Sequence, residues 1–400
     1  MNTAIVIGGG IAGCSTAYAL ARRDIKVTLI ERHENLAQEA SGNPLAVLYP
    51  KFNAKPDASS QLALHGFQFT LNLLQQLAEN ASFFNACGQI QLAFDVKEQI
   101  KQNALLQAGY LHKNGVFFRH VTSAEASEIA GIALNLGGLY LPQAGWVKPA
   151  LLCKNLVNSP LISVVTASNV LSINKSQSLW RVSHANGVQE ADCVVICSAN
   201  DIKQFPPCQS AAIIPVRGQV NFFTANTKSS PLKTIICSDH YLSPAVDGVH
   251  SIGTTYAPND ANANLSAADT LVNLKALRQI SPEIFAYINA NQTQGRVAWR
   301  SQTLDYMPLA GQLLDETKLR KNPPRYNAKS ADLPWLSGLY VNAGHGSKGM
   351  ITAPICGELI ANLITNNPLH IEEKLASRMN PSRFLLRELG LKQLAQSLYD

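Results

Sequence analysis

The sequence predicts an α/β fold, and three observations lead to this expectation. A short β-branched run at Thr3 to Ile7 is followed by a glycine-rich turn, a helix-forming segment and a second strand. A continuous apolar segment at Ala191 to Cys197 has the composition of a buried parallel strand. A second glycine-rich turn, Gly344 to Gly349, again lies between a strand and a helix. Strands and helices that alternate in this way form parallel sheets.

Composition excludes several classes of protein. The 400 residues are enough for more than one domain, and 46% of them are hydrophobic, which is sufficient for a sizeable core. The net charge of +6 is too small for a polybasic protein that packages nucleic acid. No apolar run reaches the ~18 residues of a membrane span, and no basic leader region opens the chain. We therefore expect a cytoplasmic protein with no membrane segment.

The cysteines do not form a recognisable metal or redox motif. They are scattered, and no C-x-x-C pair occurs among Cys14, Cys87, Cys153, Cys193, Cys197, Cys208, Cys237 and Cys356. We expect buried free thiols in a reducing compartment and no metal site.

The first 31 residues predict a dinucleotide-binding site. The strand Thr3 to Ile7 runs into a G-x-G-x-x-G motif, a helix follows from Ile11 to Arg23, and the strand Lys26 to Ile30 ends at an acid. The first glycine permits a tight turn, the second lets a pyrophosphate approach the backbone, and the third lets the helix pack closely. The helix N-terminus then offers free N–H groups to the phosphates, and the acid accepts hydrogen bonds from ribose hydroxyls. The expected contacts are Gly8, Gly10, Ile11, Ala12, Gly13, Glu31 and the adjacent Arg32.

Two later glycine-containing segments extend this site. The first motif does not by itself separate NAD from FAD, but its position at the start of the chain is common in flavoproteins of the glutathione-reductase type and favours FAD. The small residues Ala40, Ser41 and Gly42 would let a loop pass close to a flat ring system. In the late motif no acid-ended strand follows, so we expect its helix N-terminus to face the anionic part of a reduced flavin. The expected contacts there are Gly344, Gly346, Ser347, Lys348, Gly349 and Met350.

Because the two glycine motifs lie at opposite ends of the chain, the cofactor domain is expected to be discontinuous. We predict a Rossmann-like FAD-binding domain from residues 1–75, 145–206 and 335–400. Residues 76–144 and 207–334 would form a second, α+β substrate domain on a mixed, largely antiparallel sheet. Further helices are expected at Gln61 to Leu77, Glu98 to Ala108, Ala150 to Val157 and Leu265 to Ile280, the last with Ser266 as a cap.

The order of motifs resembles the D-amino-acid oxidase/glycine oxidase group of FAD enzymes over nearly the whole chain. The matching stretches include IVIGGGIAG, ADCVVICSAN, PVRGQV, WRSQTLDYMPLAG and AGHGSKGMITAP. Within the group, EASGNPLAVLYP, GSKGMITAPICGELIANLI and NPSRFLLREL resemble the flavin domain of the bifunctional enzyme that makes 5-methylaminomethyl-2-thiouridine in tRNA. The resemblance adds Val170, Ser198 and Ala199 to the expected FAD contacts.

This resemblance implies an oxidative cleavage. The substrate would be carboxymethylaminomethyl-uridine at the wobble position of a tRNA. Hydride would pass from the CH₂ between amine and carboxylate to flavin N5, and the imine would hydrolyse to aminomethyl-uridine and glyoxylate. The methyltransferase domain of the bifunctional enzyme has no counterpart in these residues, so we expect no methylation here and a separate methyltransferase as a partner.

The resemblance also suggests catalytic residues, each with a plainer alternative. Arg300 occupies the position of the carboxylate-binding arginine in amine-oxidising relatives, although a surface ion pair is the alternative. Lys348 would favour the anionic reduced flavin, or else is a solvated lysine near a helix start. Tyr241 would wall the substrate pocket or belong to the core. For Arg217 a structural role is the alternative, and for His345 a packed histidine is more common than a base.

Two basic segments are candidate contacts for tRNA phosphates. Lys318 to Lys329 holds five basic residues and no acid, and Arg378, Arg383 and Arg387 form a basic C-terminal element. An ordinary solvated surface has the same composition. Three functions are therefore open: a tRNA-modifying flavoenzyme, a small-molecule amine or amino-acid oxidase of the glycine oxidase type, and a flavin-binding protein without turnover.

Overall fold

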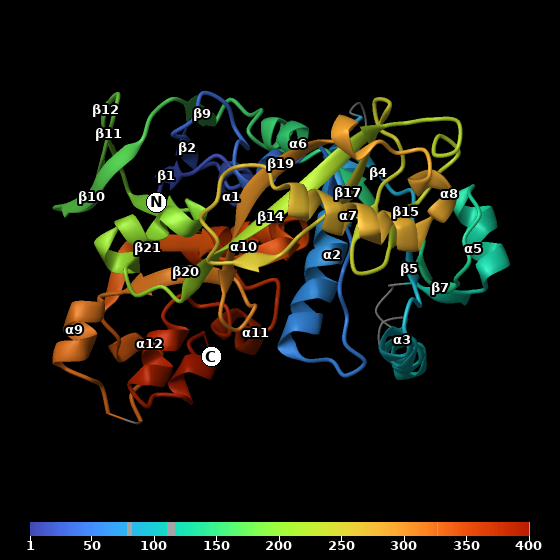
Figure 1. Ribbon diagram of the computed structural model, residues 1–400. Coiled ribbons are helices and arrows are strands. Elements are labelled where there is room, and N and C mark those ends of the chain that lie inside the picture. Colours follow the sequence, from blue (N-terminus) through green and yellow to red (C-terminus); the bar gives the residue numbers. More distant parts are fainter. Residues whose placement is uncertain (78–81, 110–116, 326, 400) are drawn as a thin grey trace.

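The computed structural model describes residues 1–77, 82–109, 117–325 and 327–399. Within these ranges it has an α/β fold with two large sheets, which confirms the predicted class. In Figure 1 one sheet, with β1, β2, β20 and β21, lies toward the left, and the other, with β5, β7 and β15, lies toward the right. The long strands β14 and β19 run between them.

The first sheet has the strand order β20-β21-β13-β1-β2-β9 in the described residues. All neighbouring pairs are parallel except β20 with β21. Parallel strands end at one edge, so the loops that follow β1, β13 and β21 converge there. The bounds are β1 Thr3–Ile7, β2 Lys26–Ile30, β9 Ile162–Val165, β13 Cys193–Ile196, β20 Leu309–Leu314 and β21 Trp335–Ala343.

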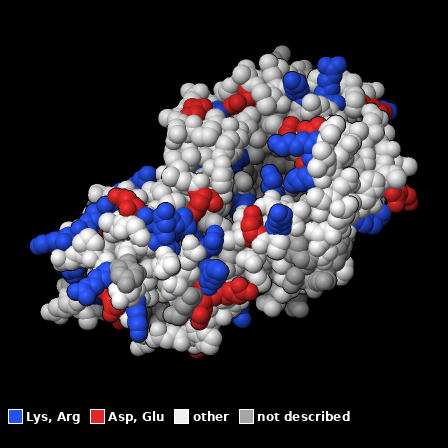
Figure 2. Space-filling model, turned by 90° about the horizontal axis from the view of Figure 1, so that it is seen from below, with Lys and Arg blue, Asp and Glu red and all other residues white. Residues whose placement is uncertain are grey.

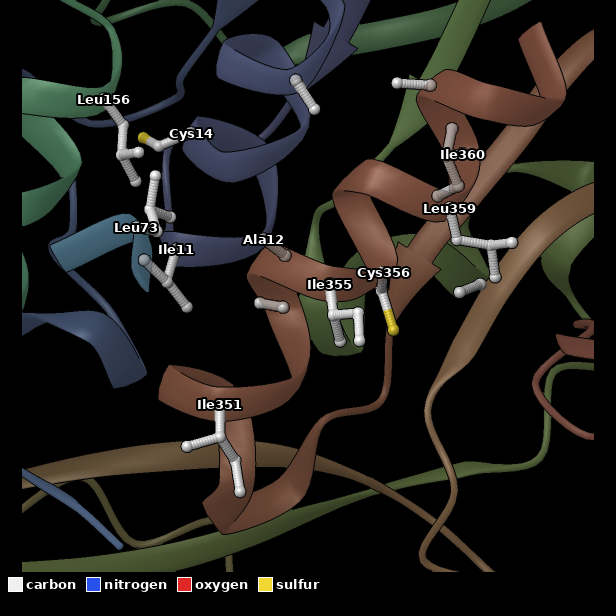
Figure 3. Close-up of a cluster of buried hydrophobic side chains, with 14 of the residues drawn as sticks. Ile11, Ala12, Cys14, Leu73, Leu156, Ile351, Ile355, Cys356, Leu359 and Ile360 are labelled. Carbon is white, nitrogen blue, oxygen red and sulfur yellow. The ribbon is translucent and has the colours of Figure 1, made fainter. Parts of the chain in front are cut away.

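Helices cover one face of this sheet and bury a large apolar cluster. Figure 3 shows side chains of α1, α2, α6 and α10 that meet there, among them Ile11, Leu73, Leu156 and Ile355. Helices α1 and α10 can approach closely because Gly357 has no side chain. A Cβ on Gly357 would lie 3.0 Å from the backbone of Ser15. The bounds are α1 Ile11–Ala21, α2 Ala58–Leu77, α6 Pro149–Leu156 and α10 Gly349–Thr365.

Successive side chains of β1 point to opposite faces of the sheet and contribute to a separate apolar cluster on each face. Ala4 and Val6 belong to the helix-covered cluster, whereas Ile5 and Ile7 pack with Trp180 and Val182 on the opposite face. That face is covered in part by a small antiparallel sheet of β10 Val170–Ser176, β11 Leu179–His184 and β12 Gly187–Ala191.

The second sheet has the order β18-β14-β17-β16-β15-β5-β7-β6, and β19 also pairs with β14. It is antiparallel apart from the β15–β5 pair, as expected for a mixed sheet. Its apolar face packs on α5, α7 and α8. The bounds are β5 Gln89–Leu92, β6 Arg119–Val121, α5 Ser123–Ala130, β7 Gly138–Leu141, β14 Ile213–Thr224, β15 Ile235–Cys237, β16 Tyr241–Leu242, β17 Val249–Gly253, β18 Ala257–Pro258, α7 Ala267–Ile280, α8 Pro282–Phe285 and β19 Gln294–Thr303.

The remaining elements are short. A third small sheet joins β3 Ala46–Leu48 and β4 Phe84–Asn85 to β8 Gly145–Val147, and α3 Val96–Ala108 lies beside the second sheet. At the C-terminal end, α9 Glu316–Lys321 and α12 Arg383–Glu388 contribute to a small apolar cluster, whereas α11 Glu373–Ser377 packs on the large cluster of the first sheet. Short 3₁₀ turns occur at Ala40–Gly42, Ala199–Gln204, Pro206–Cys208, Ala290–Gln292, Ser330–Asp332, Gly346–Lys348 and Leu394–Gln396.

Several predicted details can be compared with the described elements. Ser266 caps α7, because its hydroxyl oxygen accepts a hydrogen bond from Asp269 N at 3.3 Å. Strand β20 lies within 207–334, the range expected for the second domain, yet it pairs with β21 as the antiparallel edge of the first sheet. The two strands are consecutive in the chain, and consecutive strands often pair in one sheet, here across a connection that contains α9.

Candidate active site

A cavity of about 910 Å³ opens where the carboxyl ends of β1, β13 and β21 face the second sheet. Its lining includes the loop after β1 and the start of α10 on one side, and residues of β16 and β19 on the other. Figure 2 shows the surface hollowed between two parts of the molecule, with basic atoms in the hollow and both charges at its rim. The cavity is therefore lined by residues of both large sheets.

Each of the three glycines of the first motif is required for a different structural reason. Gly8 adopts φ +108°, and a Cβ there would lie 2.7 Å from Cys197 O. A Cβ on Gly13 would lie 1.8 Å from Gly8 O, which explains how closely α1 packs. At Gly10 the nearest atom to a Cβ is Ser41 Oγ at 3.4 Å, so the protein itself leaves this space free. The free space lies at the N-terminus of α1, where a pyrophosphate is expected.

Glu31 lies directly after β2 and lines the cavity. Its two oxygens accept hydrogen bonds from Gly9 N at 2.6 Å and His33 N at 2.9 Å. A carboxylate has about four acceptor positions, so two backbone bonds orient Glu31 and leave capacity for ribose hydroxyls.

Arg32 also lines the cavity and ties the neighbouring loops together. Its guanidinium donates to Glu39 at 2.6 Å and to Asp201 at 2.7 Å. Burial opposes ionisation of Glu39, but hydrogen bonds from His33 and Arg32 hold the pKa of Glu39 below its usual value.

The other expected cofactor residues are distributed around the same cavity. Ser41 Oγ accepts a hydrogen bond from Ile11 N at 3.0 Å. The Oγ of Ser198 is buried with no hydrogen-bond partner in the described ranges, as is Oδ1 of Asn200. Buried polar atoms of this kind in a cavity wall are expected to meet a ligand. The expected contacts that line the cavity are Gly8, Gly10, Ile11, Ala12, Glu31, Arg32, Ala40, Ser41, Val170, Ser198 and Ala199, whereas Gly13 and Gly42 lie behind the surface.

The second glycine motif brings the start of α10 to the cavity. Gly344 and Gly346 adopt φ +74° and +56°. Both line the cavity together with Ser347, Gly349 and Met350. The N-terminus of a 17-residue helix thus faces the space in which the flavin ring is expected.

The side chain of Lys348 does not line the cavity. Its ammonium donates to Ser59 Oγ at 2.8 Å, near the start of α2. Burial, together with repulsion from Lys51, lowers the pKa of Lys348. Any effect of Lys348 on the cofactor therefore acts at a distance, through its charge.

His345 is packed rather than free to act as a base. Nε2 donates to Asn342 Oδ1 at 3.0 Å, and Nδ1 lies 2.9 Å from Thr352 Oγ1. This tautomer follows because the Asn342 side-chain nitrogen donates to Thr16 Oγ1, which leaves only its oxygen to accept. Burial lowers the pKa of His345 to about 4, so the ring is neutral at physiological pH.

Arg300 and Tyr241 lie together at the substrate side of the cavity. The Arg300 guanidinium donates to Thr254 Oγ1 at 3.0 Å and to Thr255 O at 3.4 Å. No ion pair to Arg300 is formed within the described part of the chain. Burial lowers the pKa of Arg300 and raises that of Tyr241, which the nearby Arg300 partly offsets. A half-buried cation without a carboxylate partner is suited to an anionic ligand.

Gly218 explains how the guanidinium reaches its place. A Cβ on Gly218 would lie 2.8 Å from both terminal nitrogens of Arg300, so the side chain crosses the strand at this point. Arg217, the preceding residue, is structural: its buried guanidinium pairs with Asp269 and donates to Asn262 O at 2.6 Å and Asn264 O at 2.8 Å. These bonds hold the segment that follows β18, which forms a further wall of the cavity.

Sequence reasoning missed several lining residues. They include Lys51, Phe94, Lys101, His240 and Trp299. Both ring nitrogens of His240 are buried without a hydrogen-bond partner among the described residues. Trp299 opens the stretch WRSQTLDYMPLAG, beside Arg300, and could have been found there, whereas the other four lie outside the quoted motifs and only the fold brings them to the cavity.

The expected tRNA contacts divide into exposed and internal residues. Arg383 is wrong as a phosphate contact, because its side chain is 0% exposed and pairs with Asp305 at 2.7 Å. Arg387 shares the same carboxylate at 3.4 Å. In the segment Lys318 to Lys329, where Tyr326 lies outside the described residues, Arg320 is paired with Glu316 and Glu388. Asp305 is far from Arg383 in the sequence, and Glu388 is far from Arg320. The local composition of the basic segments therefore could not indicate either ion pair.

Other expected absences concern metals, disulfides and membrane spans. All eight cysteines are free, and all but Cys87 are buried. No cluster of His, Cys, Asp and Glu suited to a metal occurs in the described residues. No helix in the same residues is long and apolar enough to cross a membrane.

Comparison with known proteins agrees with this geometry. The sequence profile of a family described as "FAD dependent oxidoreductase" matches residues 3–363. The chain is 38% identical over 397 residues to "tRNA 5-methylaminomethyl-2-thiouridine biosynthesis bifunctional protein MnmC" of Methylobacillus flagellatus, which covers 99% of this chain and 61% of that protein. The protein of the same name from Ectopseudomonas mendocina is 39% identical, with 96% and 60% covered. The chain spans about three fifths of the length of these curated relatives, and the resemblance stated above is confirmed.

Solved structures show the same fold. Glycine oxidase from Geobacillus kaustophilus matches with a TM-score of 0.76 at 21% identity, covering 96% of this chain and 99% of that one. Iminodiacetate oxidase from Chelativorans sp. BNC1 matches with a TM-score of 0.76 at 18% identity, covering 94% and 98%. The expected cofactor, FAD, is confirmed by the family match, which also removes the alternative of a flavin-binding protein without turnover. The chain belongs to the family of FAD dependent oxidoreductases.

Proposed function

We propose that this chain removes the carboxymethyl group from carboxymethylaminomethyl-uridine at the wobble position of tRNA, giving aminomethyl-uridine and glyoxylate. The names of its relatives support the tRNA pathway, and the single observation that supports the chemistry is Arg300. This half-buried guanidinium lines the cavity without a carboxylate partner in the described residues. The substrate carboxylate supplies that partner.

The reaction balances as a two-electron oxidation followed by hydrolysis. The CH₂ between amine and carboxylate loses a hydride and the amine loses its proton, so a C=N bond replaces the N–H and C–H bonds. Water then adds to that carbon and the C–N bond breaks, which releases glyoxylate and leaves the amine on the uridine. Bound FAD supplies the two-electron oxidant.

Residues of the chain hold the cofactor and orient the substrate. We assign the pyrophosphate to Gly10 and the N-terminus of α1, the ribose to Glu31, and the electron-accepting ring to the start of α10. The first sheet would then be a Rossmann-like FAD domain, with the domain ranges given above apart from β20. Arg300 holds the carboxylate, and Tyr241 walls the same space.

No strong base is required from the protein. The reacting amine must be neutral, and a buried cation nearby favours the neutral form. His345 is neutral and occupied by two hydrogen bonds, so it supports the start of α10 instead of accepting the proton. Lys348 adds positive charge close to the same helix end.

Two surfaces are candidates for the tRNA backbone. The cavity rim carries Lys51, which is exposed and forms no ion pair within the described ranges, and Lys101, which pairs with Glu98 at 3.3 Å. The second surface comprises the exposed cations of the segment Lys318 to Lys329 with Arg378, at the end that carries α9 and α12, on the left in Figure 2. Because the wobble nucleotide must enter the cavity, we assign the flanking phosphates to the rim and more distant phosphates to the second surface.

The proposed function is tested by nucleoside mass spectrometry of tRNA from cells with and without the gene. Carboxymethylaminomethyl-uridine should accumulate in its absence, and wild-type protein but not Arg300→Gln should remove it. Unchanged nucleosides would favour a small-molecule amine oxidase. We also propose that the protein works in the cytoplasm.

A further inference from the structure

Arg296 connects the second sheet to the loop that faces the cofactor. It lies on β19, and its Nη1 donates to Asn43 Oδ1 at 2.9 Å. Its Nη2 donates to the backbone oxygens of Gln38 and Glu39 at 2.7 Å and 2.6 Å. A residue of the second sheet thus makes three hydrogen bonds to residues 38–43, which we name the cofactor loop.

The cofactor loop has a direct contact with the dinucleotide motif. Ser41 Oγ accepts a hydrogen bond from Ile11 N at the start of α1, and both Ser41 and Asn43 line the cavity. On the other side of the loop, Arg32 and His33 bind the Glu39 carboxylate. Without Arg296, the loop loses the three hydrogen bonds that connect it to the second sheet. The bonds of Ser41 Oγ, of the Glu39 carboxylate and of Gly42 N to Glu39 O remain.

The cofactor loop packs closely against the Arg296 guanidinium at Gly42. A Cβ on Gly42 would lie 2.7 Å from Nη2 and 3.2 Å from Cζ of Arg296, so the loop backbone rests on the guanidinium. Burial lowers the pKa of Arg296, and no carboxylate forms an ion pair with it among the described residues. Its partners are neutral oxygens spread over three residues, an arrangement that a planar fork of donors satisfies and a lysine ammonium does not.

Arg296 lies on the same strand as Arg300, the residue expected to bind the substrate carboxylate. Arg296 and Arg300 are four residues apart on β19, so both lie on the same face of the strand. One element therefore carries the contact to the cofactor loop and the expected contact to the substrate carboxylate.

We propose that Arg296 is a positioning residue for FAD, which acts by holding residues 38–43 against the start of α1. It does not touch the reacting atoms. The proposal depends on FAD as the cofactor and is independent of whether the substrate is a tRNA.

The test measures FAD affinity on refolded or dialysed apoprotein, by titration with FAD fluorescence as the readout. Arg296→Gln should weaken FAD binding about 10- to 100-fold, since two or more hydrogen bonds to a charged group are lost. Arg296→Lys should recover only part of that loss. Arg181→Gln, at an exposed arginine on β11, is the matched control and should bind FAD as the wild type does.

Two further measurements separate positioning from general stability. Urea unfolding of the apoproteins should give similar midpoints for wild type and Arg296→Lys, while their FAD affinities differ. The effects of Arg296→Gln and Asn43→Ala should be less than additive, because the two side chains share one hydrogen bond. Wild-type FAD affinity in Arg296→Gln, or an affinity loss that follows the loss of apoprotein stability in both variants, would overturn the proposal.

Discussion

Arg300 Nη2 donates a hydrogen bond to Thr254 Oγ1 at 3.0 Å, and this neutral hydroxyl is the best-formed of its contacts. The hydroxyl orients the guanidinium but does not neutralise it. The charge is therefore left for a ligand in the cavity, which is the basis of the first prediction.

Arg300→Gln should lose oxidation of the substrate while keeping FAD. Removal of a charge-assisted contact to the reacting carboxylate should cost about 2–4 kcal/mol of transition-state stabilisation, or roughly 30- to 800-fold in kcat/KM. Single-turnover flavin reduction measures the loss, and the flavin absorbance of the purified variant checks retention of the cofactor. Normal turnover by this variant would show that another group holds the carboxylate.

Gly10→Val should give a folded protein that does not bind FAD. A Cβ at Gly10 meets nothing closer than Ser41 Oγ at 3.4 Å, so the protein has room for the first side-chain atom, and the valine methyl groups would occupy the space expected for the pyrophosphate. Gly13→Val is the contrasting variant, since its Cβ would lie 1.8 Å from Gly8 O and should prevent correct folding. Circular dichroism and flavin absorbance distinguish the two outcomes. Retention of FAD by Gly10→Val would mean that the pyrophosphate lies elsewhere.

The half-buried His345 should make the free energy of unfolding depend on pH. Burial lowers its pKa from 6.5 to about 4, so between these values the unfolded chain binds a proton that the folded protein does not. The free energy of unfolding should therefore fall as the pH is lowered from 6.5 toward 4, by up to about 1.4 kcal/mol per pH unit from this group. His345→Gln should have a shallower dependence in urea titrations across that range. If the free energy of unfolding fell equally with pH in the two proteins, the lowered pKa of His345 would be contradicted.

The two basic surfaces should differ in their effect on tRNA. Lys51→Gln, at the cavity rim, should reduce kcat/KM for modified tRNA several-fold and reduce the magnitude of the salt-dependence slope by about 0.7 to 0.9. Lys318→Gln is the matched control at an exposed lysine that already pairs with Asp315, and it should have a smaller effect. Assays at several salt concentrations measure both, and a larger effect at Lys318 would reverse the assignment of the surfaces.

Local patterns were sufficient to predict the first two strands of the first sheet and the glycine turn between them. The strand, glycine motif, helix and acid from Thr3 to Glu31 are contiguous, so their spacing carries the geometry, and β1 and β2 have the predicted bounds. Ser266 was predicted as a cap for the same reason, since a capping contact spans only three residues.

Contacts between distant segments could not be predicted from these patterns. Arg383 belongs to a basic run, yet Asp305, 78 residues away, pairs with it inside the protein. The ammonium of Lys348 points away from the cavity because it donates a hydrogen bond to Ser59, a residue 289 positions away in the sequence. Arg296 belongs to no recognisable motif, because two of its three partners are backbone oxygens and all three lie in a loop more than 250 residues away in the sequence.

The most direct test of the proposed function is anaerobic flavin reduction with two substrates that share the N–CH₂–COO⁻ unit. Modified tRNA should reduce the flavin much faster than free glycine, because contacts remote from the reacting carbon position it. Its rate should fall steeply with salt, whereas that of glycine should not. Faster reduction by glycine, with no salt dependence for tRNA, would contradict the tRNA function and identify a small-molecule amine oxidase.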